Sequence, residues 1–486
     1  MNSEKIRVRF APSPTGYLHV GGLRTALYNY LFAKKNNGTF ILRIEDTDRN
    51  RYVEGAVEKL IKALKWAGLQ YDEGPEVGGE FGPYLQSQRL DIYKKYADEL
   101  IAKGKAYYCF CSPERLKTLR EEQEKQKLPQ AKYDKHCLHL SKKEIEKNLS
   151  SAIPKVVRLN IEQNHSIKFD DLIRGHVEFE SNNVDDQILI KGDGYPTYHL
   201  ANVVDDHLMK ITHVIRGEEW LSSTPKHVLL YDAFGWERPK FAHLPLLLNP
   251  DRSKLSKRQG DVAVEDYREK GFLKEALINF VALLGWNAGD DRELYNMDGL
   301  IKNFSLERVN KSGAVFDLQK LHWLNAEHLR KKSEGELLNL LNEELQKSKY
   351  KDQFYSDIYL LMIIKSMKER VSFVKEFIDN CIYFYEAPTQ YEQKAVEKNW
   401  KPETPEQLQK FKNELAQYDN PTIEDFEHII TKTAEELKIG KAKLIHPLRL
   451  AVSGQSTGPG MFDLLFILGK DEVIKRIDSA IQKISV

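Results

Sequence analysis

Short apolar runs alternate with amphipathic stretches over the first third of the chain. Residues 6–11 and 39–45 have the length and apolar content of buried strands. The stretches that follow them, 23–35 and 53–67, repeat apolar residues at the spacing of one helix face. Strands that alternate with helices in this way predict βαβ units and a parallel sheet.

The alternation stops between about Tyr107 and Asn183. That segment contains cysteines, a highly charged helix-like stretch at 114–127 and short strand-like runs. The earlier pattern then returns, with strands expected at 188–191, 212–216 and 241–248 and a helix at 225–234. We therefore interpret the segment as an insertion into the sheet domain.

After about residue 261 the chain is nearly all helix-like. Alternating gaps of four and three separate the apolar residues Leu360, Ile364, Met367, Val371, Val374 and Ile378, which predicts one amphipathic helix. The polar, proline-containing stretch 388–421 is expected to be a junction between two helical subdomains.

Composition narrows the class of protein. A chain of 486 residues is too long for one core, and 30% charged with 41% hydrophobic residues is ordinary for a globular protein. The first ten residues lack the apolar core of a secretory signal, and no apolar run reaches the length of about 18 residues that would predict a membrane span. Four cysteines are too few for a disulfide scaffold, so we expect a cytoplasmic protein. A net charge of +1 argues against a protein that coats nucleic acid non-specifically.

Two short motifs predict a nucleotide site. Residues 12–22, with His19 and Gly21, join the strand-like run 6–11 to a helix, and a helix N-terminus after a glycine-bearing turn binds anions. Residues 254–258, Lys-Leu-Ser-Lys-Arg, place three cations after the second-half strand 241–248. Alone, a histidine after a strand is usually structural and a cationic run is usually a solvated loop. Neither a G-x-G-x-x-G nor a Walker A pattern occurs, so a standard dinucleotide fold or P-loop is not expected.

Charged residues at strand ends are candidates for binding an amino acid. Arg9 and Arg216 each end an apolar run, and a guanidinium fork pairs bidentately with a carboxylate. Glu45 is the candidate partner for an ammonium group. The alternative is that the arginines are rim residues and that the acidic cluster 45–48 caps a helix.

The cysteines suggest a metal site. Cys109-x-Cys111 is followed after 25 residues by Cys137-x-His139, and three thiols with one imidazole suit tetrahedral zinc. Buried cysteine pairs are also often inert. Cys381 has no sequence partner and is expected in the core.

The motifs at 12–22 and 254–258 together are similar to the two ATP-handling motifs of class I aminoacyl-tRNA synthetases, and their surroundings resemble the glutamyl-tRNA synthetase family. The tetrapeptide 19–22, His-Val-Gly-Gly, stands where the class has His-Ile-Gly-His. Lys-Leu-Ser-Lys-Arg stands where it usually has Lys-Met-Ser-Lys-Ser. Both departures are typical of the glutamyl branch. Residues 193–202 resemble the glutamate pocket of that family, and the resemblance covers nearly the whole chain.

The resemblance implies an α/β fold: a split Rossmann-like domain with an inserted zinc-bearing subdomain, followed by an all-α C-terminal half. ATP would be bound by His19, Gly21, Glu219, Lys254, Leu255, Ser256, Lys257 and Arg258, with His19, Lys254 and Lys257 in catalytic roles. Glutamate would be bound by Arg9, Ala11, Glu45, Tyr198, Asn202 and Arg216. Structural zinc would be held by Cys109, Cys111, Cys137 and His139. Arg370 would contact the anticodon, or would be a solvated charge on the helix that contains it.

The expected domains follow this scheme. They are the first half of the catalytic domain (1–106), the inserted acceptor-stem and zinc subdomain (107–185), the second catalytic half (186–250), a loop and helical stem-contact domain (251–325) and an α-helical anticodon-binding domain of two subdomains (326–486).

The implied activity is the ATP- and Mg²⁺-dependent conversion of glutamate to glutamyl-adenylate, followed by transfer to the terminal adenosine of tRNA(Glu). Catalysis would rest on orientation and on stabilising phosphate charge. A monomer is the family norm. The short paralogue that glutamylates a tRNA nucleoside lacks the helical half, and glutaminyl enzymes carry a different first motif. A non-catalytic zinc-bearing RNA-binding protein would need neither Arg216 nor the 254–258 loop. The sequence leaves open whether tRNA(Gln) is charged and which arginine binds which glutamate carboxylate.

Overall fold

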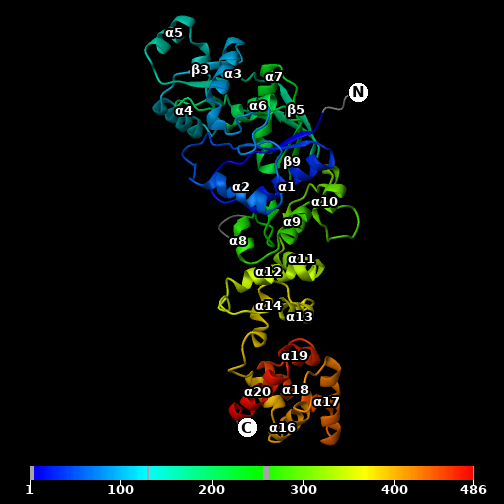
Figure 1. The fold of residues 1–486 in the computed structure, drawn as a ribbon. Coiled ribbons are helices and arrows are strands. Elements are labelled where there is room, and N and C mark those ends of the chain that lie inside the picture. Colours follow the sequence, from blue (N-terminus) through cyan, green and yellow to red (C-terminus); the bar gives the residue numbers. More distant parts are fainter. Residues whose placement is uncertain (1–4, 128–130, 256–261, 485–486) are drawn as a thin grey trace. The chain divides into compact units, whose positions relative to one another are not determined.

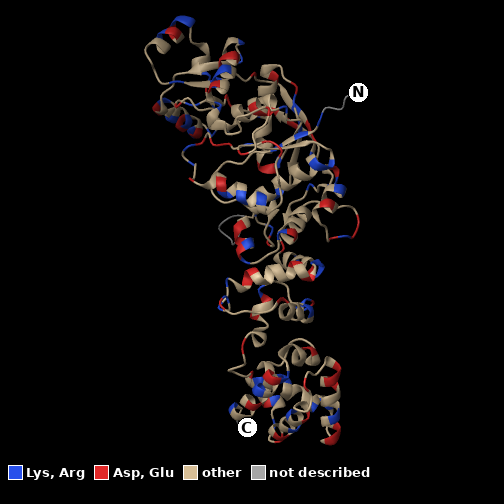
Figure 2. Ribbon diagram, viewed as in Figure 1, with Lys and Arg blue, Asp and Glu red and all other residues tan. Residues whose placement is uncertain are grey.

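The computed structural model describes residues 5–127, 131–255 and 262–484 (Figure 1). The chain forms two compact units, residues 1–270 with 274–321, and residues 271–273 with 322–486. No described helix is long and apolar enough to cross a membrane. Lys and Arg are interspersed with Asp and Glu over the described chain, in keeping with the net charge of +1 (Figure 2).

The first unit contains the parallel strands that the sequence predicts. β1 (Arg7–Phe10) pairs in parallel with β2 (Thr39–Leu42), and β8 (His213–Gly217) pairs in parallel with β9 (Lys240–Leu244). β1 lies beside β8, since the amide of Thr212 donates to the carbonyl of Arg7 at 2.9 Å. Elements around residues 7–42 and 198–244 therefore lie side by side, although they are far apart in the sequence (Figure 1).

The helices around this sheet carry the site residues. α1 (Val20–Lys35) begins three residues before the predicted stretch 23–35, because His19 caps it. α2 (Ala56–Trp66) and α7 (Thr224–Phe234) also match predicted helices. α6 (Tyr198–Leu208) was not anticipated as a helix, and its four-residue spacing brings Tyr198, Asn202 and Asp206 to one face.

The predicted strand 241–248 is wrong as one element. It is divided into β9 and β10 (Leu247–Leu248), and β10 pairs with β11 (Ala314–Val315) instead of extending the β8–β9 pair. Pro245 lies at the break, where it has no N–H to donate to a neighbouring strand.

The segment 107–183 contains two kinds of structure. β3 (Ala106–Cys109) and β4 (Val156–Leu159) form an antiparallel sheet with β7 (Ile188–Ile190), which follows the segment, and α4 (Pro113–Lys125) and α5 (Lys142–Ser150) lie between β3 and β4 in the sequence. β5 (Ser166–Asp171) and β6 (Gly175–Glu180) form a hairpin that extends the β8–β9 sheet in the order β6-β5-β9-β8. The hairpin therefore brings Asp171 to the β8–β9 sheet, where it lies opposite Phe241 of β9.

The remaining helices of the first unit are α3 (Leu90–Ala102), α8 (Val264–Glu269), α9 (Lys274–Leu283) and α10 (Met297–Asn303), and α11 (Leu318–Lys331) runs from the first unit into the second. The described part of the second unit is helical, as predicted. Its elements are α12 (Glu334–Leu345), α13 (Asp357–Met367), α14 (Glu376–Asp379), α15 (Gln393–Asn399), α16 (Thr404–Leu415), α17 (Ile423–Glu436), α18 (Lys441–Ser453), α19 (Met461–Leu468) and α20 (Lys470–Lys483).

Two predictions about this unit need correction. The stretch 388–421 is not only a junction, because it contains α15 and α16, and Pro405 lies in the first turn of α16, where a helix tolerates proline. The predicted single helix over 360–378 ends at Met367 and a second one begins at Glu376. Between them the Glu376 carboxylate accepts from the amides of Ser372 (2.6 Å) and Phe373 (3.2 Å), which stabilises the turn that precedes α14. Arg370 therefore lies exposed in the turn between the helices and not on a helix face.

Candidate active site

A cavity of about 390 Å³ lies at the carboxyl ends of β1 and β8, beside the start of α1. Ligands of parallel sheets bind at this end of the strands. The cavity lining includes the predicted residues Arg9, Ala11, His19, Gly21, Glu45, Tyr198, Asn202, Arg216 and Glu219. A cavity of about 350 Å³ shares His19, Gly21 and Glu219 with it and adds Lys254 and Leu255. Ser256, Lys257 and Arg258 lie outside the described residues.

The start of α1 is arranged to receive an anion. His19 is the N-cap residue, and its Nδ1 accepts from the amide of Gly21 at 3.0 Å, which leaves the ring proton on Nε2. The first turn of α1 contains no acidic residue, so the positive end of the helix dipole is not offset there. A Cβ at position 22 would lie 3.0 Å from Leu18, so glycine permits the tight approach of the turn to the helix.

A buried network of charges lies behind the cavity. The guanidinium of Arg9 forms a fork with Asp206 (3.0 and 3.2 Å), and Arg43 donates to Asp206 (2.7 Å) and Glu45 (3.0 Å). With its amide nitrogen toward Asp206, Asn202 accepts from Arg9 at 3.3 Å and from Arg43 at 3.1 Å. Arg9 therefore shares its charge with a protein carboxylate.

The two acids of this network differ in their pKa values. Burial alone would raise the pKa of Asp206, but Arg9 and Arg43 outweigh burial and hold it below its ordinary value. Burial raises the pKa of Glu45 above its ordinary value in spite of Arg43. Another cation at the cavity would lower the pKa of Glu45 again, so this carboxylate is suited to an ammonium ligand.

Arg216 has a different environment from Arg9. Its Nε donates to His243 Nε2 (3.1 Å), its Nη1 to the Tyr198 hydroxyl (2.9 Å) and His227 Nδ1 (3.3 Å), and its Nη2 to Thr224 Oγ1 (2.9 Å). These acceptors are neutral, and no carboxylate in the described ranges lies within ion-pair distance of Arg216. The side chain is only 5% exposed. Because no described carboxylate pairs with it, its positive charge remains available to a ligand in the cavity.

Three of the four predicted metal ligands meet in the inserted segment. The sulfur atoms of Cys109, Cys111 and Cys137 all lie within 4.8 Å of one another. His139 is exposed at the end of the 3₁₀ turn His136–His139, and it is not part of the cluster. The hydroxyl of Tyr133 lies 3.3 Å from Cys111 Sγ and accepts from the amide of Cys137 at 3.0 Å. Sequence reasoning missed Tyr133, although its place four residues before Cys137 was visible.

The chemistry of the cluster fits a thiophilic metal. The hydrogen bond with the Cys137 thiol lowers the pKa of Cys109 to about 4. A thiolate and two further thiols suit three of the positions around a four-coordinate zinc ion.

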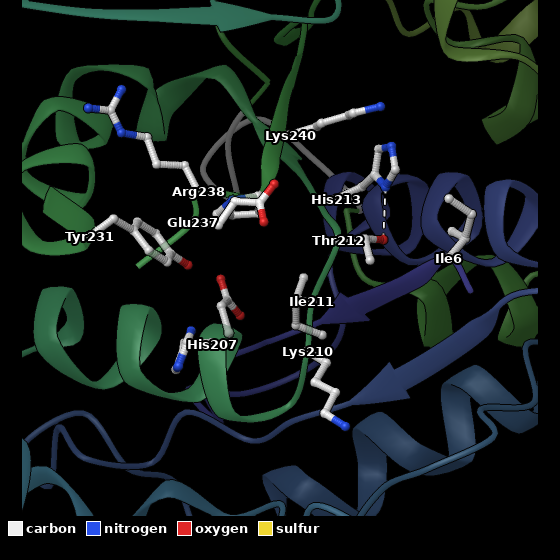
Figure 3. A pocket seen from close by; sticks show the side chains of 12 residues that line it. Ile6, His207, Lys210, Ile211, Thr212, His213, Tyr231, Glu237, Arg238 and Lys240 are labelled. Atoms are coloured by element: carbon white, nitrogen blue, oxygen red, sulfur yellow. Dashed lines mark hydrogen bonds between the residues drawn. The ribbon is translucent and has the colours of Figure 1, made fainter. Parts of the chain in front are cut away.

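A third cavity, of about 470 Å³, opens at the amino ends of β1, β8 and β9 (Figure 3). Lys210, Arg238 and Lys240 project around it, together with Glu237 and Tyr231 (Figure 3). Its lining includes Asp206 but comes from outside the two motifs. The predicted ATP and glutamate residues that the structure describes therefore line the cavities at the other end of the strands.

Comparison with known proteins identifies the family. Residues 5–323 match the family described as tRNA synthetases class I (E and Q), catalytic domain, and residues 331–481 match an anticodon binding domain. The chain is 54% identical to the glutamate–tRNA ligase of Chloroherpeton thalassium and 52% identical to that of Chlorobium phaeobacteroides, over 100% of this chain and 99% of each relative.

Solved structures agree with these matches. The crystal structure of a glutamate tRNA ligase from Elizabethkingia meningosepticum in complex with its amino acid superposes with a TM-score of 0.94. That of the glutamate-tRNA synthetase from Elizabethkingia anophelis superposes with a TM-score of 0.91. Each is 42% identical, and the alignment covers 99% of this chain and 100% of the other. Because the catalytic-domain match alone spans well over half of its length, this chain belongs to the class I tRNA synthetases of the E and Q group.

Proposed function

We propose that the chain is a glutamate–tRNA ligase, which activates L-glutamate with ATP and transfers the glutamyl group to the terminal adenosine of tRNA(Glu). The observation that carries this proposal is Arg216, a buried cation whose described partners are all neutral. Such a cation favours a carboxylate over the amide of glutamine, because an amide leaves its charge unpaired in a site of low polarity.

The cavity offers a partner for each group of glutamate. The ammonium group would lie near the Glu45 carboxylate and the carbonyl of Ala11. The side-chain carboxylate would be recognised by Arg216 and the Tyr198 hydroxyl, which share a hydrogen bond of 2.9 Å. Arg9 and Asn202 line the same cavity, but the charge of Arg9 is already shared with Asp206. Arg216 therefore carries the larger part of the selectivity.

ATP would bind across the start of α1. The phosphates would meet His19 and the turn at Gly21, and Glu219 would contact the nucleotide. Mg²⁺ would be held mainly by phosphate oxygens. Lys254 lines the cavity, and Lys257 and Arg258 follow it in the chain. These cations would stabilise the negative charge that builds on the phosphate oxygens in the transition state.

The reaction needs no nucleophilic side chain. A carboxylate oxygen of glutamate attacks the α-phosphorus of ATP, and pyrophosphate leaves. A ribose hydroxyl of the tRNA terminal adenosine then attacks the acyl carbon, and AMP leaves. The protein supplies orientation and charge stabilisation.

The inserted segment would hold a structural zinc ion at Cys109, Cys111 and Cys137, with the Tyr133 oxygen as the nearest described fourth donor. His139 would need the turn that carries it to rearrange. Helices α4 and α5 of this segment bury no residues, so a metal would stabilise a segment with little core of its own.

Other partners follow from the family. The region 331–481 would bind the anticodon arm of tRNA(Glu), and the exposed Arg370 remains a candidate contact there. The ligase would act as a cytoplasmic monomer.

The test is amino-acid-dependent exchange between ATP and pyrophosphate, assayed with and without tRNA(Glu), followed by charging of purified tRNA(Glu) and tRNA(Gln). We expect exchange with glutamate, dependent on tRNA, and charging of tRNA(Glu). Exchange with glutamine alone would indicate a glutaminyl enzyme. No exchange with either amino acid would indicate a non-catalytic RNA-binding protein.

A further inference from the structure

Two histidines contact the guanidinium of Arg216, and the other ring nitrogen of each lies within hydrogen-bond distance of a further side chain. His243 on β9 accepts from Arg216 Nε (3.1 Å), and its Nδ1 lies 2.6 Å from the Asp171 carboxylate. His227 on α7 accepts from Arg216 Nη1 (3.3 Å), and its Nε2 lies 3.1 Å from His199 Nδ1. His227 is 1% exposed, and His243 is 0% exposed.

The directions of the hydrogen bonds between Arg216 and the two histidines are determined. A guanidinium can only donate, so His243 Nε2 and His227 Nδ1 must accept. The remaining ring protons are then on Nδ1 of His243, facing Asp171, and on Nε2 of His227, facing His199. A protonated imidazole at either position has no lone pair for Arg216, so both histidines must be neutral.

The surroundings keep them neutral. Burial is the largest cause that lowers the pKa of His227, and the charge of Arg216 adds to it. Burial also lowers the pKa of His243 and outweighs the opposing effect of Asp171. Burial followed by the charge of Lys226 lowers the pKa of His199 to about 3.

We propose that His227 and His243 are positioning residues for amino-acid selection, because they hold the guanidinium of Arg216 as neutral acceptors and leave its charge for the substrate. This inference rests on the proposed function. A carboxylate in place of either ring would hold Arg216 equally well, but it would also pair with its charge, as Asp206 does with Arg9. Glutamate would then lose its electrostatic advantage over glutamine.

The number of N–H groups of Arg216 that already have an acceptor indicates how the substrate carboxylate would be bound. Of the five N–H groups of a guanidinium, those of Arg216 already have four described acceptors, which leaves one on Nη2. The Tyr198 hydroxyl accepts from Arg216, so its own proton is free to be donated to the substrate. The substrate carboxylate therefore meets one guanidinium N–H and one phenol O–H.

The experiment compares three substitutions at His227. Asn keeps a neutral acceptor near the position of Nδ1, Leu removes the acceptor, and Asp supplies a charged one. Km and kcat for glutamate and for glutamine are measured by ATP–pyrophosphate exchange with tRNA present, and the Km for ATP is measured in parallel. Lys240→Gln, at the cavity of Figure 3, is the matched control outside the Arg216 cluster.

We expect His227→Asn and Lys240→Gln to stay within about threefold of the wild type. His227→Leu should raise the Km for glutamate about tenfold or more with little change in kcat or in the Km for ATP, the scale of one lost hydrogen bond to a charged group. His227→Asp should lower the preference for glutamate over glutamine about tenfold or more.

Equal effects of Asn and Leu would show that the ring is only a structural filler, and an unchanged preference in His227→Asp would show that neutrality does not matter. Either result overturns the inference while the wild-type exchange still supports the proposed function. Absence of glutamate-dependent exchange in the wild type would instead defeat the proposed function itself. If the Leu or Asp variant does not fold, ¹⁵N NMR of labelled histidines decides: neutral rings with the stated tautomers support the inference, and an imidazolium at either position overturns it.

Discussion

Arg9 and Arg216 each lie one residue before the end of a strand, and both line the cavity at the carboxyl ends of the sheet. Arg9 is paired with Asp206 through both arms of its fork, whereas the described acceptors of Arg216 are two imidazoles, a phenol and a hydroxyl. A charge that is already paired exerts only a weak electrostatic field on a ligand, whereas an unpaired buried charge exerts a strong one. The amino-acid preference of the site should therefore depend on Arg216 more than on Arg9.

Replacing Arg216 tests this at the scale of one residue. Arg216→Gln should lower kcat/Km for glutamate by roughly 10²–10³-fold, since a buried charge pair with the substrate is lost, while the use of glutamine stays constant or rises. Arg216→Lys is the matched variant, because it keeps the charge but cannot form the planar fork that four acceptors require. It should recover part of the preference for glutamate. Wild-type glutamate kinetics in Arg216→Gln would show that the side chain is not part of the amino-acid pocket.

At the scale of elements, the end of β3 and the turn His136–His139 bring three cysteines together across 26 residues of sequence from Cys111 to Cys137. We expect about one zinc ion per chain, measured by metal analysis of protein purified without chelator. Cys137→Ser should lose the metal and lower the melting temperature. His139→Ala should keep both, because His139 is outside the cluster, and Tyr133→Phe should weaken zinc binding. Loss of zinc in His139→Ala would show that His139 is a zinc ligand after all. A metal-free wild type with a normal melting temperature would refute the zinc site.

The loop that starts at Lys254 provides the second prediction at this scale. Lys254 lines the cavity that His19 and Gly21 share, and Lys257 follows three residues later. Lys257→Ala should slow single-turnover activation roughly 10²–10³-fold, the scale of one lost electrostatic donor, with little change in the affinity for glutamate. Lys254→Ala provides the comparison from the described part of the loop. An unchanged activation rate in Lys257→Ala would mean that this cation does not stabilise the negative charge of the transition state.

The period of apolar residues predicted the elements that one segment of sequence determines by itself. β1, β2, α1 and α7 were found in this way, because burial on one side or both leaves a local pattern. The break at Pro245 and the end of α13 at Met367 were missed, since alternating apolar spacing continues through both. Apolar Val371 and Val374 are buried although they lie in the turn between two helices, so burial preserved the pattern without the helix.

Candidate site residues could be predicted where they belong to a sequence motif, as His19 and Lys254 do. His227 and His243 belong to no motif, and their role depends on contacts between α7, β9 and the end of β8. Asp171 reaches the same cluster from a hairpin that the sequence assigned to the insertion. A linear pattern contains no signal for such contacts, so the structure was needed to find them.

At the scale of the whole molecule, the catalytic-domain match and the anticodon-domain match together cover most of the chain. Positive and negative residues are interspersed over the described chain, so recognition of a polyanionic tRNA has to rest on local placement of cations and on shape and not on a net positive charge (Figure 2).

The buried neutral histidines make the free energy of unfolding of the whole molecule depend on pH. Burial is the largest cause that lowers the pKa of His199 to about 3 and that of His213 to about 4, and the pKa values of His227 and His243 are lowered too. In the unfolded chain these rings titrate near about 6.5. As the pH falls below that value, the unfolded state takes up protons that the folded state refuses, so the free energy of unfolding decreases toward pH 4.

We therefore expect the melting temperature to fall more steeply with decreasing pH between pH 6.5 and 5 than it does above pH 7, measured by calorimetry in buffers of equal ionic strength. Carboxylates with lowered pKa values, such as Asp206, act only near and below their unfolded pKa of about 3.9, so they do not contribute between pH 6.5 and 5. The lowered pKa of Cys109 adds a slope of the same sign in this window, and a histidine variant separates the part that the histidines contribute. His213→Gln should make the slope in this window smaller without affecting the Arg216 cluster, because the described contacts of the His213 ring are with Thr212 and Phe32. A melting temperature that is equal at pH 7 and pH 5 would show that the folded protein accepts protons on these rings, and the assignment of His227 and His243 as neutral acceptors of Arg216 would fail with it.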